Sequence, residues 1–367
     1  MNLLPQQAEK CLYWQLKNNM NKEQSFQEKY NAIGKKETTS NGLFVTAVIT
    51  TGIFCLPSCR AKKPKAENVV FYTTPQEALQ HGFRPCKICK PMEPKGNCPA
   101  AVQQLIAELH QNPFVKIKDF DLRKRNIEPS FIRRWFKNNH AITFHAYQRM
   151  LRLNSAYKQL KNGSSVTSTA FDTGYESLSG FGASYKNIFS EPPSKSTNKN
   201  VINITRFSTK LGAMFACATE QGLCLLEFTD RKMLEWEFKD LCKRFDALIL
   251  PGENKFLLQI EKEANEYLDG KRKKFTVPLL PSGTEFQQSV WKILQQITFG
   301  STISYQELAN KMNNPKATRA VATANGYNKI AFAIPCHRVI GSDGHLTGYG
   351  GGLGRKKFLI ELEQSCF

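Results

Sequence analysis

A cysteine and a histidine stand side by side near the C-terminus, in the stretch Pro335-Cys336-His337. The apolar run Ile330–Ile334 precedes them, so Cys336 should lie at the edge of a buried segment. Burial disfavours the thiolate, so a thiol in such a place is normally inert. A neighbouring histidine, itself oriented by a carboxylate, would remove the thiol proton directly or through one water and leave a nucleophile. The alternative, from these residues alone, is a structural cysteine beside a hydrogen-bonded histidine.

The residues before this pair predict a helix-turn-helix. Thr284-x-x-Gln287 is a capping box that opens an amphipathic helix, and Ser304-x-x-Glu307 opens a second helix that runs to about Met312. The turn Asn313-Asn314-Pro315 leads into a third helix, with Pro315 at its first position and Gly326 at its end. That helix carries Arg319 among alanines, and small residues allow the backbone to approach a nucleic-acid groove.

Residues 281–363 resemble the catalytic domain of O6-alkylguanine-DNA alkyltransferases, whose signature Pro-Cys-His-Arg-Val occurs at 335–339. The resemblance implies a helical, winged-helix-like domain in which Cys336 accepts the alkyl group, with His337 and a water as its base. It also implies that Glu363 orients His337 and that Asn328 braces the turn holding the site.

The same resemblance implies DNA contacts for three further residues. Arg319 would enter the duplex in place of the flipped guanine, Tyr305 would steady the phosphate and the guanine, and Tyr349 would line the pocket. Gly350 departs from the pattern, because relatives often have a larger or hydrogen-bonding residue there, and this departure bears on the lid of the pocket and on its alkyl range.

Composition bounds the possible partners. The 367 residues suffice for two to four domains, and 41% hydrophobic content supports folded cores. The net charge of +20 indicates a polyanionic partner, and we favour nucleic acid over an acidic membrane because neither end carries a strongly amphipathic basic helix. No apolar run approaches membrane-spanning length, and residues 1–27 show no signal peptide. Eleven cysteines in such a chain favour thiol or metal chemistry over disulfides.

Four cysteines in two local pairs predict a metal site. Cys55 and Cys59 are separated by three residues, and Cys86 and Cys89 follow after 26 intervening residues, separated by two. Two such pairs suit tetrahedral zinc, although ordinary thiols or a redox pair are the alternatives. A β-branched run over residues 44–51 predicts a strand just before them.

The flanks of these cysteines resemble the N-terminal domain of Ada proteins, over Thr50–Arg60 and Gly82–Lys87. The resemblance implies one zinc ion per chain, bound by all four cysteines, and a second role for Cys55 as acceptor of a methyl group from a DNA phosphotriester. Zinc keeps a thiol deprotonated at neutral pH, so a ligand thiolate is a ready nucleophile. Nearby basic residues would hold DNA phosphates, or would simply form a solvated basic face: Arg60, Lys62, Lys63 and Arg84.

Residues 100–190 carry 13 Lys and Arg against 6 Asp and Glu, and two helix-turn-helix patterns can be recognised there. The first places Ser130, Arg133 and Arg134 on the outer side of a helix that begins at Pro129. A single pattern of this kind is often a plain helical hairpin, but two in tandem, joined by a helix at about 146–160, resemble the AraC-type DNA-binding domain. The second recognition helix contains Gly180 and Gly182, which weaken a helix, so base reading should rest on the first motif.

The expected organisation is a multidomain α+β chain. It comprises a leader (1–41), a zinc-binding methylphosphotriester-repair domain (42–92), an all-α tandem helix-turn-helix domain (100–190), a linker (191–200), a small α/β subdomain (201–280) and a catalytic alkyltransferase domain (281–367). Residues 201–280 show three strand signals and a helix at about 232–245, without chemistry of their own.

The combined resemblance implies a stoichiometric repair methyltransferase that methylation of Cys55 converts into a sequence-specific activator of the alkylation response. Its partners would be methylated and promoter double-stranded DNA, and RNA polymerase on activation, with no membrane involved. We expect a monomer in the bacterial cytoplasm, associated with the nucleoid when bound to DNA. Two alternatives are a transcription regulator with a vestigial transferase domain and a zinc-containing cysteine hydrolase. The joint presence of Cys336, His337, Asn328 and Glu363 argues against the first, and the abundance of basic residues against the second.

Overall fold

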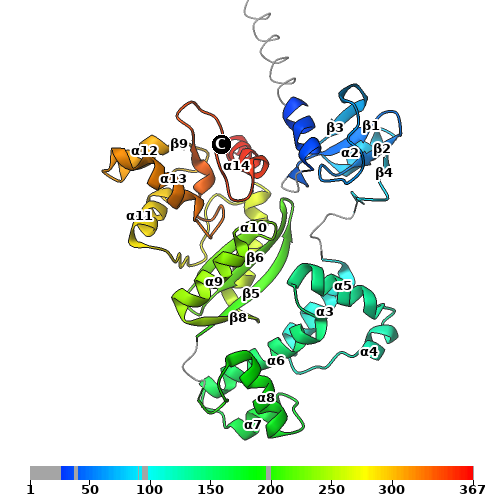
Figure 1. Cartoon of the computed structure of the whole chain (residues 1–367), viewed down its shortest axis with the longest axis vertical. Coiled ribbons are helices and arrows are strands. Elements are labelled where there is room, and N and C mark those ends of the chain that lie inside the picture. The colour runs from blue at the N-terminus through cyan, green and yellow to red at the C-terminus, as the bar shows by residue number, and fades with distance from the viewer. Residues whose placement is uncertain (1–25, 37–39, 90, 93–97, 196–199, 367) are drawn as a thin grey trace, which may run out of the picture. The chain divides into compact units, whose positions relative to one another are not determined.

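The computed structural model describes residues 26–36, 40–89, 91–92, 98–195 and 200–366 (Figure 1). Most of the expected leader (1–25) and part of the expected linker (196–199) lie outside these residues. The chain forms two compact units that divide after Lys95, with the short segment 352–358 assigned to the first. Each unit is described by itself below.

A four-stranded sheet forms the centre of the first unit, in the order β3-β1-β2-β4. β1 runs antiparallel to β2 and β3, whereas β2 and β4 are parallel. The elements are β1 (Val45–Val48), β2 (Ile53–Cys55), η2 (Ala66–Asn68), β3 (Val69–Tyr72), α2 (Pro75–Gln80) and β4 (Arg84–Pro85). A helix over residues 26–35 buries Ala32 and Ile33 together with Phe44. This packing extends the folded unit to the N-terminal side of residue 42.

Six helices make up residues 100–189, and they form the tandem arrangement expected there (Figure 1). They are α3 (Ala100–Gln111), α4 (Asp119–Lys124), α5 (Pro129–His140), α6 (Phe144–Lys161), α7 (Val166–Asp172) and α8 (Leu178–Phe189). α4 packs against α5, α7 packs against α8, and α6 contacts α5 and α7. Ile132, Trp135 and Phe136 of α5 are buried, as their helical spacing predicts, so the opposite side of α5 faces solvent.

A second four-stranded sheet follows, in the order β7-β6-β5-β8. It consists of β5 (Asn200–Thr209), β6 (Gly212–Ala218), β7 (Leu223–Phe228) and β8 (Ala247–Pro251), and the helices α9 (Leu234–Phe245) and α10 (Lys255–Leu268) pack against it. β5 is antiparallel to β6 and parallel to β8. Cys217 and Cys224 lie in the apolar core of this subdomain. Neither β8 nor α10 had been predicted from the sequence.

The last part of the chain is mainly helical. It contains α11 (Glu285–Leu294), β9 (Ile303–Ser304), α12 (Tyr305–Lys311), η4 (Pro315–Ala317), α13 (Thr318–Gly326), η5 (Cys336–Arg338), β10 (Val339–Ile340) and α14 (Leu353–Ser365). Both predicted capping boxes are present, at Thr284 and Ser304. The α-helix predicted from Pro315 begins only at Thr318, because the Ala317 N–H donates to the Asn314 carbonyl (3.0 Å) and closes a short 3-10 turn first. The buried indole N–H of Trp291 donates to Ala324 and ties α11 to α13.

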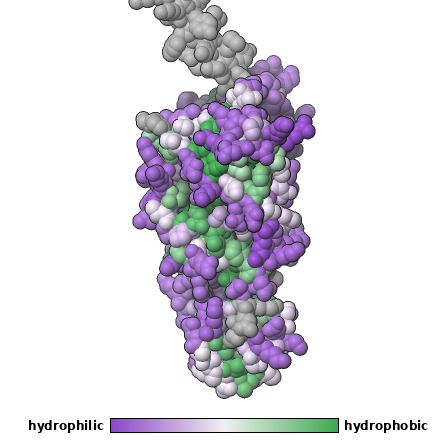
Figure 2. Space-filling model, turned by 90° about the vertical axis from the view of Figure 1, so that its left-hand side faces the viewer, coloured by the Kyte–Doolittle hydropathy of each residue, from purple (hydrophilic) through white to green (hydrophobic). Residues whose placement is uncertain are grey.

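Hydrophobic areas lie among hydrophilic ones on the face shown in Figure 2. Among the residues that the structure describes, no helix combines the length and apolar character needed to cross a bilayer.

Candidate active site and metal centre

The edge of the second sheet positions the segment that leads to Cys336. The Leu226 N–H of β7 donates to the Lys329 carbonyl (2.9 Å), and the Ala331 N–H donates to the Leu226 carbonyl (2.8 Å). The apolar residues that follow are buried, as the sequence predicted, and Cys336 itself is 6% exposed at the start of η5. The small α/β subdomain therefore acts as a support for the thiol.

Asn328 holds the turn in which this thiol lies. Its side-chain oxygen accepts from the Ile330 N–H (3.0 Å), and its amide nitrogen lies 2.9 Å from the Ile334 carbonyl. The same nitrogen lies 3.1 Å from Cys336 Sγ, so it can donate to the sulfur. An N–H donated to sulfur favours the thiolate over the thiol. Asn328 is 2% exposed, so this stabilisation acts away from water.

Glu363 of α14 lies behind His337. The His337 Nε2 atom is 2.7 Å from a Glu363 carboxylate oxygen, and both side chains are almost completely buried. The Arg338 guanidinium donates to both oxygens of this carboxylate, Tyr267 of α10 donates its hydroxyl to one, and the Gly300 N–H donates to the other (2.9 Å). Burial opposes ionisation of Glu363, but the bonds and charges of His337 and Arg338 outweigh it and lower its pKa to about 2.

A cavity of about 540 Å³ opens beside Cys336. Four of the seven residues that the sequence placed near the reaction line it: Cys336, Arg319, Tyr305 and Tyr349. Arg319 is exposed on α13, whereas Tyr305 and Tyr349 are half-buried. Among the described residues, no hydrogen-bond partner is found for the buried hydroxyl of Tyr349. The cavity is thus open to solvent at Arg319 and ends at a thiol.

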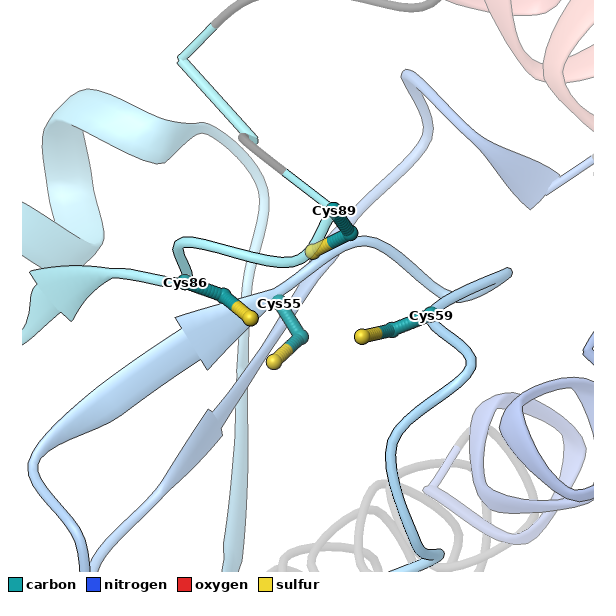
Figure 3. A group of neighbouring side chains, drawn as sticks. All are labelled: Cys55, Cys59, Cys86 and Cys89. Atoms are coloured by element: carbon teal, nitrogen blue, oxygen red, sulfur yellow. The ribbon is translucent and has the colours of Figure 1, made fainter.

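The four cysteines of the first unit converge on one point (Figure 3). The Cys86 N–H donates to the Phe54 carbonyl (3.0 Å), which continues the β2–β4 pairing and sets Cys86 beside Cys55. All four sulfurs lie within 4.8 Å of one another. Tetrahedral zinc, with ligand distances of about 2.3 Å, needs sulfurs about 3.8 Å apart, so this donor set fits the metal. Cys55 is half-buried, and the other three are buried.

The remaining predicted DNA contacts lie on the surface. Arg60, Lys62 and Arg84 are exposed around the cysteine cluster. Lys63 is also exposed, and its ammonium group lies 3.7 Å from the centre of the Tyr30 ring. In the first helix-turn-helix, Ser130, Arg133 and Arg134 are exposed on α5, and Arg133 forms an ion pair with Asp119.

Sequence reasoning missed Tyr267 and the role of Arg338. Arg338 lies within the Pro-Cys-His-Arg-Val signature, so its position beside His337 was available as a signal. Tyr267 is separated from Glu363 by 96 positions and lies on a helix that was not predicted, so no local pattern pointed to it.

Replacement of Glu363 by Gln should remove an acid-sensitive part of the stability. Because the pKa of Glu363 is lowered from 4.5 to about 2, its ionisation stabilises the fold above about pH 4.5, and this contribution is lost as the pH falls towards 2. It amounts to about 3 kcal/mol. Hydrogen exchange in residues 255–366 should therefore show a steeper loss of protection on acidification in the wild type than in Glu363→Gln. The exposed Glu361 of the same helix supplies the control Glu361→Gln, and equal slopes in all three proteins would contradict the prediction.

Replacement of Cys86 by Ser should reduce tightly bound zinc, since one of four thiolate ligands is lost. Elemental analysis should find one zinc per chain in the wild type and in Cys98→Ser, whose sulfur lies outside the cluster. Chelation should unfold residues 42–92 locally, because metal binding and folding are coupled. A full equivalent of tightly bound zinc in Cys86→Ser would remove Cys86 from the ligand set.

Three family models match the chain. The metal binding domain of Ada covers residues 28–92, a helix-turn-helix domain covers 123–199, and the 6-O-methylguanine DNA methyltransferase DNA binding domain covers 285–365. These matches support the expected combination of a zinc-binding domain, a helix-turn-helix domain and an alkyltransferase domain, and the cysteine cluster is the site of one zinc ion per chain.

Several relatives are similar to much of the chain. The bifunctional transcriptional activator/DNA repair enzyme Ada of Escherichia coli is 33% identical over 92% of this chain and 96% of its own length. The regulatory protein ada of Salmonella typhimurium is 31% identical over 89% and 94%. A methylated-DNA–protein-cysteine methyltransferase of Methanosarcina acetivorans is 41% identical over 44% of this chain and 97% of its own. Because the first two align along nearly their whole length, the chain belongs to the Ada family of bifunctional transcriptional activators and DNA repair enzymes.

Proposed function

We propose that two cysteines of this DNA repair methyltransferase each accept one methyl group: Cys336 from O6-methylguanine and Cys55 from a DNA methylphosphotriester. The chain is a methylated-DNA–protein-cysteine methyltransferase and a transcriptional activator that binds DNA. The observation that carries the assignment to Cys336 is its place in the cavity, with the Asn328 amide 3.1 Å from its sulfur and the His337–Glu363 pair beside it.

In the proposed reaction, the Cys336 thiol passes its proton through one water to His337. Glu363 stabilises the imidazolium that forms, and the Asn328 N–H stabilises the thiolate. The sulfur attacks the methyl carbon, so an S–C bond forms as the C–O bond breaks and its electron pair goes to the guanine. The guanine takes up one proton, which balances the proton removed from the thiol. Each chain reacts once at this site, because a thioether is not readily hydrolysed.

Base flipping gives three residues of the cavity their proposed roles. A base in the DNA stack cannot reach Cys336, so the guanine must leave the duplex. Arg319, exposed at the mouth of the cavity on α13, would fill the vacated position. Tyr305 would steady the phosphate and the base, and the Tyr349 hydroxyl, which has no hydrogen-bond partner among the described residues, would be available to the alkylated base in the pocket.

The exposure of Cys55 supports its proposed role as the second acceptor. It is the half-buried member of the cluster, and the exposed cations Arg60, Lys62 and Arg84 would hold the DNA phosphates beside it. Zinc, when bound, keeps the thiolates deprotonated at neutral pH. Transfer of the methyl group to Cys55 sulfur breaks its bond to the phosphotriester oxygen, so the phosphate regains its negative charge.

In this proposal, the helix-turn-helix domain recognises the promoter sequence. Ser130, Arg133 and Arg134 on α5 would contact DNA, and Arg133 would exchange its ion pair with Asp119 for a DNA contact. RNA polymerase is the proposed partner on activation, with the protein acting as a monomer. Since both substrates are DNA, we propose that the protein acts in the bacterial cytoplasm, and that it lies at the nucleoid when it is bound to DNA.

Peptide mapping after reaction tests both acceptors at once. Duplex DNA carrying O6-methylguanine and methylphosphotriesters should leave one methyl group on Cys336 and one on Cys55 of the wild type. Cys336→Ala should lose only the first, because its remaining thiols lack the bracing network. Cys242→Ser, changed outside both sites, should react as the wild type does. Repeated turnover, or a methyl group found on any other cysteine, would contradict the assignment.

Methylation of Cys55 should tighten promoter binding by changing a charge. A divalent cation with four thiolates has a net charge of −2, and one neutral thioether makes it −1. Less repulsion of phosphates should raise affinity on the order of tenfold at low salt, and the gain should shrink as salt rises. Fluorescence titration of promoter DNA with both forms over a salt series measures it, with protein methylated at Cys336 alone as control. Equal affinities of both forms at low salt would rule out the switch.

A further inference from the structure

Arg231 is a buried cation beside the Cys336 cavity that the proposed reaction does not use. It lies between β7 and α9 and is 8% exposed. Its Nη1 atom donates to Glu227 (2.9 Å), its Nε atom forms an ion pair with Glu237 (2.8 Å), and its Nη2 atom donates to the Gly326 carbonyl at the end of α13 (2.9 Å). Three contacts in different directions fix the plane of the guanidinium.

The charge of Arg231 is retained in this environment. Burial lowers its pKa, but the negative charges of Glu227 and Glu237, with a contribution from Cys336, raise it overall. Removing a buried guanidinium from two buried carboxylates is costly, so the group is expected to stay in place when a ligand enters. Arg231 therefore behaves as a fixed part of the cavity wall.

Gly350 makes room for this guanidinium. A Cβ atom at position 350 would lie 1.8 Å from Arg231 Nη1, so no other residue fits while Arg231 keeps its place. Gly348, two residues earlier, also lines this cavity, but a Cβ built on it would meet no atom of the other described residues within 4 Å, apart from its chain neighbours. Arg231 and Gly350 both line the cavity that contains Cys336 and Tyr349. The wall of the cavity is thus formed here by an arginine from the small α/β subdomain.

A guanidinium carries five N–H groups. Among the described residues, Nη1 and Nη2 each donate one hydrogen bond, which leaves one N–H on each of these two atoms, whereas Nε is paired with Glu237 by charge without hydrogen-bond geometry. An oxygen atom of a ligand that reaches this wall would receive a charge-assisted hydrogen bond, and an apolar group of the same size would not.

We propose that Arg231 determines which alkyl groups Cys336 accepts, and that it favours short groups carrying a hydrogen-bond acceptor, such as 2-hydroxyethyl, over apolar groups of equal size. The inference rests on the proposed transfer to Cys336 and adds the substrate class. The alkyl carbon meets the sulfur, and the terminal oxygen of the group meets the free N–H groups of Arg231. Gly350 is the complementary requirement, since any side chain there would displace the guanidinium.

The test compares two guanine lesions that differ by one atom. Single-turnover rate constants are measured for duplex DNA containing O6-(2-hydroxyethyl)guanine and O6-propylguanine, and their ratio is taken within each protein. The wild type should favour the hydroxyethyl lesion by about tenfold, the usual scale of a hydrogen bond to a charged group. Arg231→Met should bring the ratio close to one, whereas Arg272→Met should keep it. Arg272 also pairs with two glutamates but does not line the cavity.

A second variant is needed because Arg231→Met could lose the preference simply by unfolding. Gly350→Ala keeps every charge and should displace the guanidinium, so its ratio should also fall close to one, while Gly348→Ala should keep the wild-type ratio. Equal rates for both lesions in the wild type, or an unchanged preference in Gly350→Ala with a folded chain, would overturn the proposal. A wild type that repairs O6-methylguanine but shows no preference contradicts this inference alone, whereas one that transfers no alkyl group to Cys336 contradicts the proposed function.

Discussion

One buried carboxylate holds the alkyltransferase domain together. A charge such as that of Glu363 is tolerated away from water only when its oxygens are fully paired, and here the partners come from separate segments. Tyr267 lies on α10, Gly300 lies in the loop after α11, and His337 and Arg338 lie in η5. Because these bonds meet at one group, the position of the imidazole beside Cys336 depends on the small subdomain and on α14 as much as on the signature itself.

The two sulfurs proposed as acceptors would be prepared by different physical means. Cys336 is buried and depends on hydrogen bonds and a nearby imidazole, which must be aimed within a few tenths of an ångström. Cys55 is half-buried, and its proposed reactivity would come from a metal that favours the thiolate without a positioned base. The first arrangement suits a flipped base that is brought into a pocket. The second suits a lesion on the outside of the duplex, which needs only an accessible sulfur and nearby cations.

Local signals in the sequence predicted a large part of this architecture. The cysteine spacing predicted the metal cluster, the capping boxes at Thr284 and Ser304 predicted two helices, and the helical pattern of α5 predicted its buried side. What escaped prediction depends on contacts between distant residues. The Tyr267–Glu363 bond and the Arg231–Gly326 bond each join residues about 95 positions apart, and neither leaves a local periodicity. The packing of the helix at residues 26–35 against Phe44 also escaped prediction, because it joins a polar stretch to an apolar residue that lies beyond it.

By whole residue, Cys59, Cys86 and Cys89 are buried, and Cys55 is the partly exposed cysteine of the cluster. Once Cys55 carries a methyl group, as proposed, the most exposed cysteine of the cluster has been used. Each chain then records only that it has met one methylated phosphate. It records neither how many lesions the DNA carried nor when they formed. No internal step erases the mark, because a thioether is stable in water. The duration of the signal is therefore set by how quickly cells dilute or degrade the marked chains, and its strength by the number of chains marked.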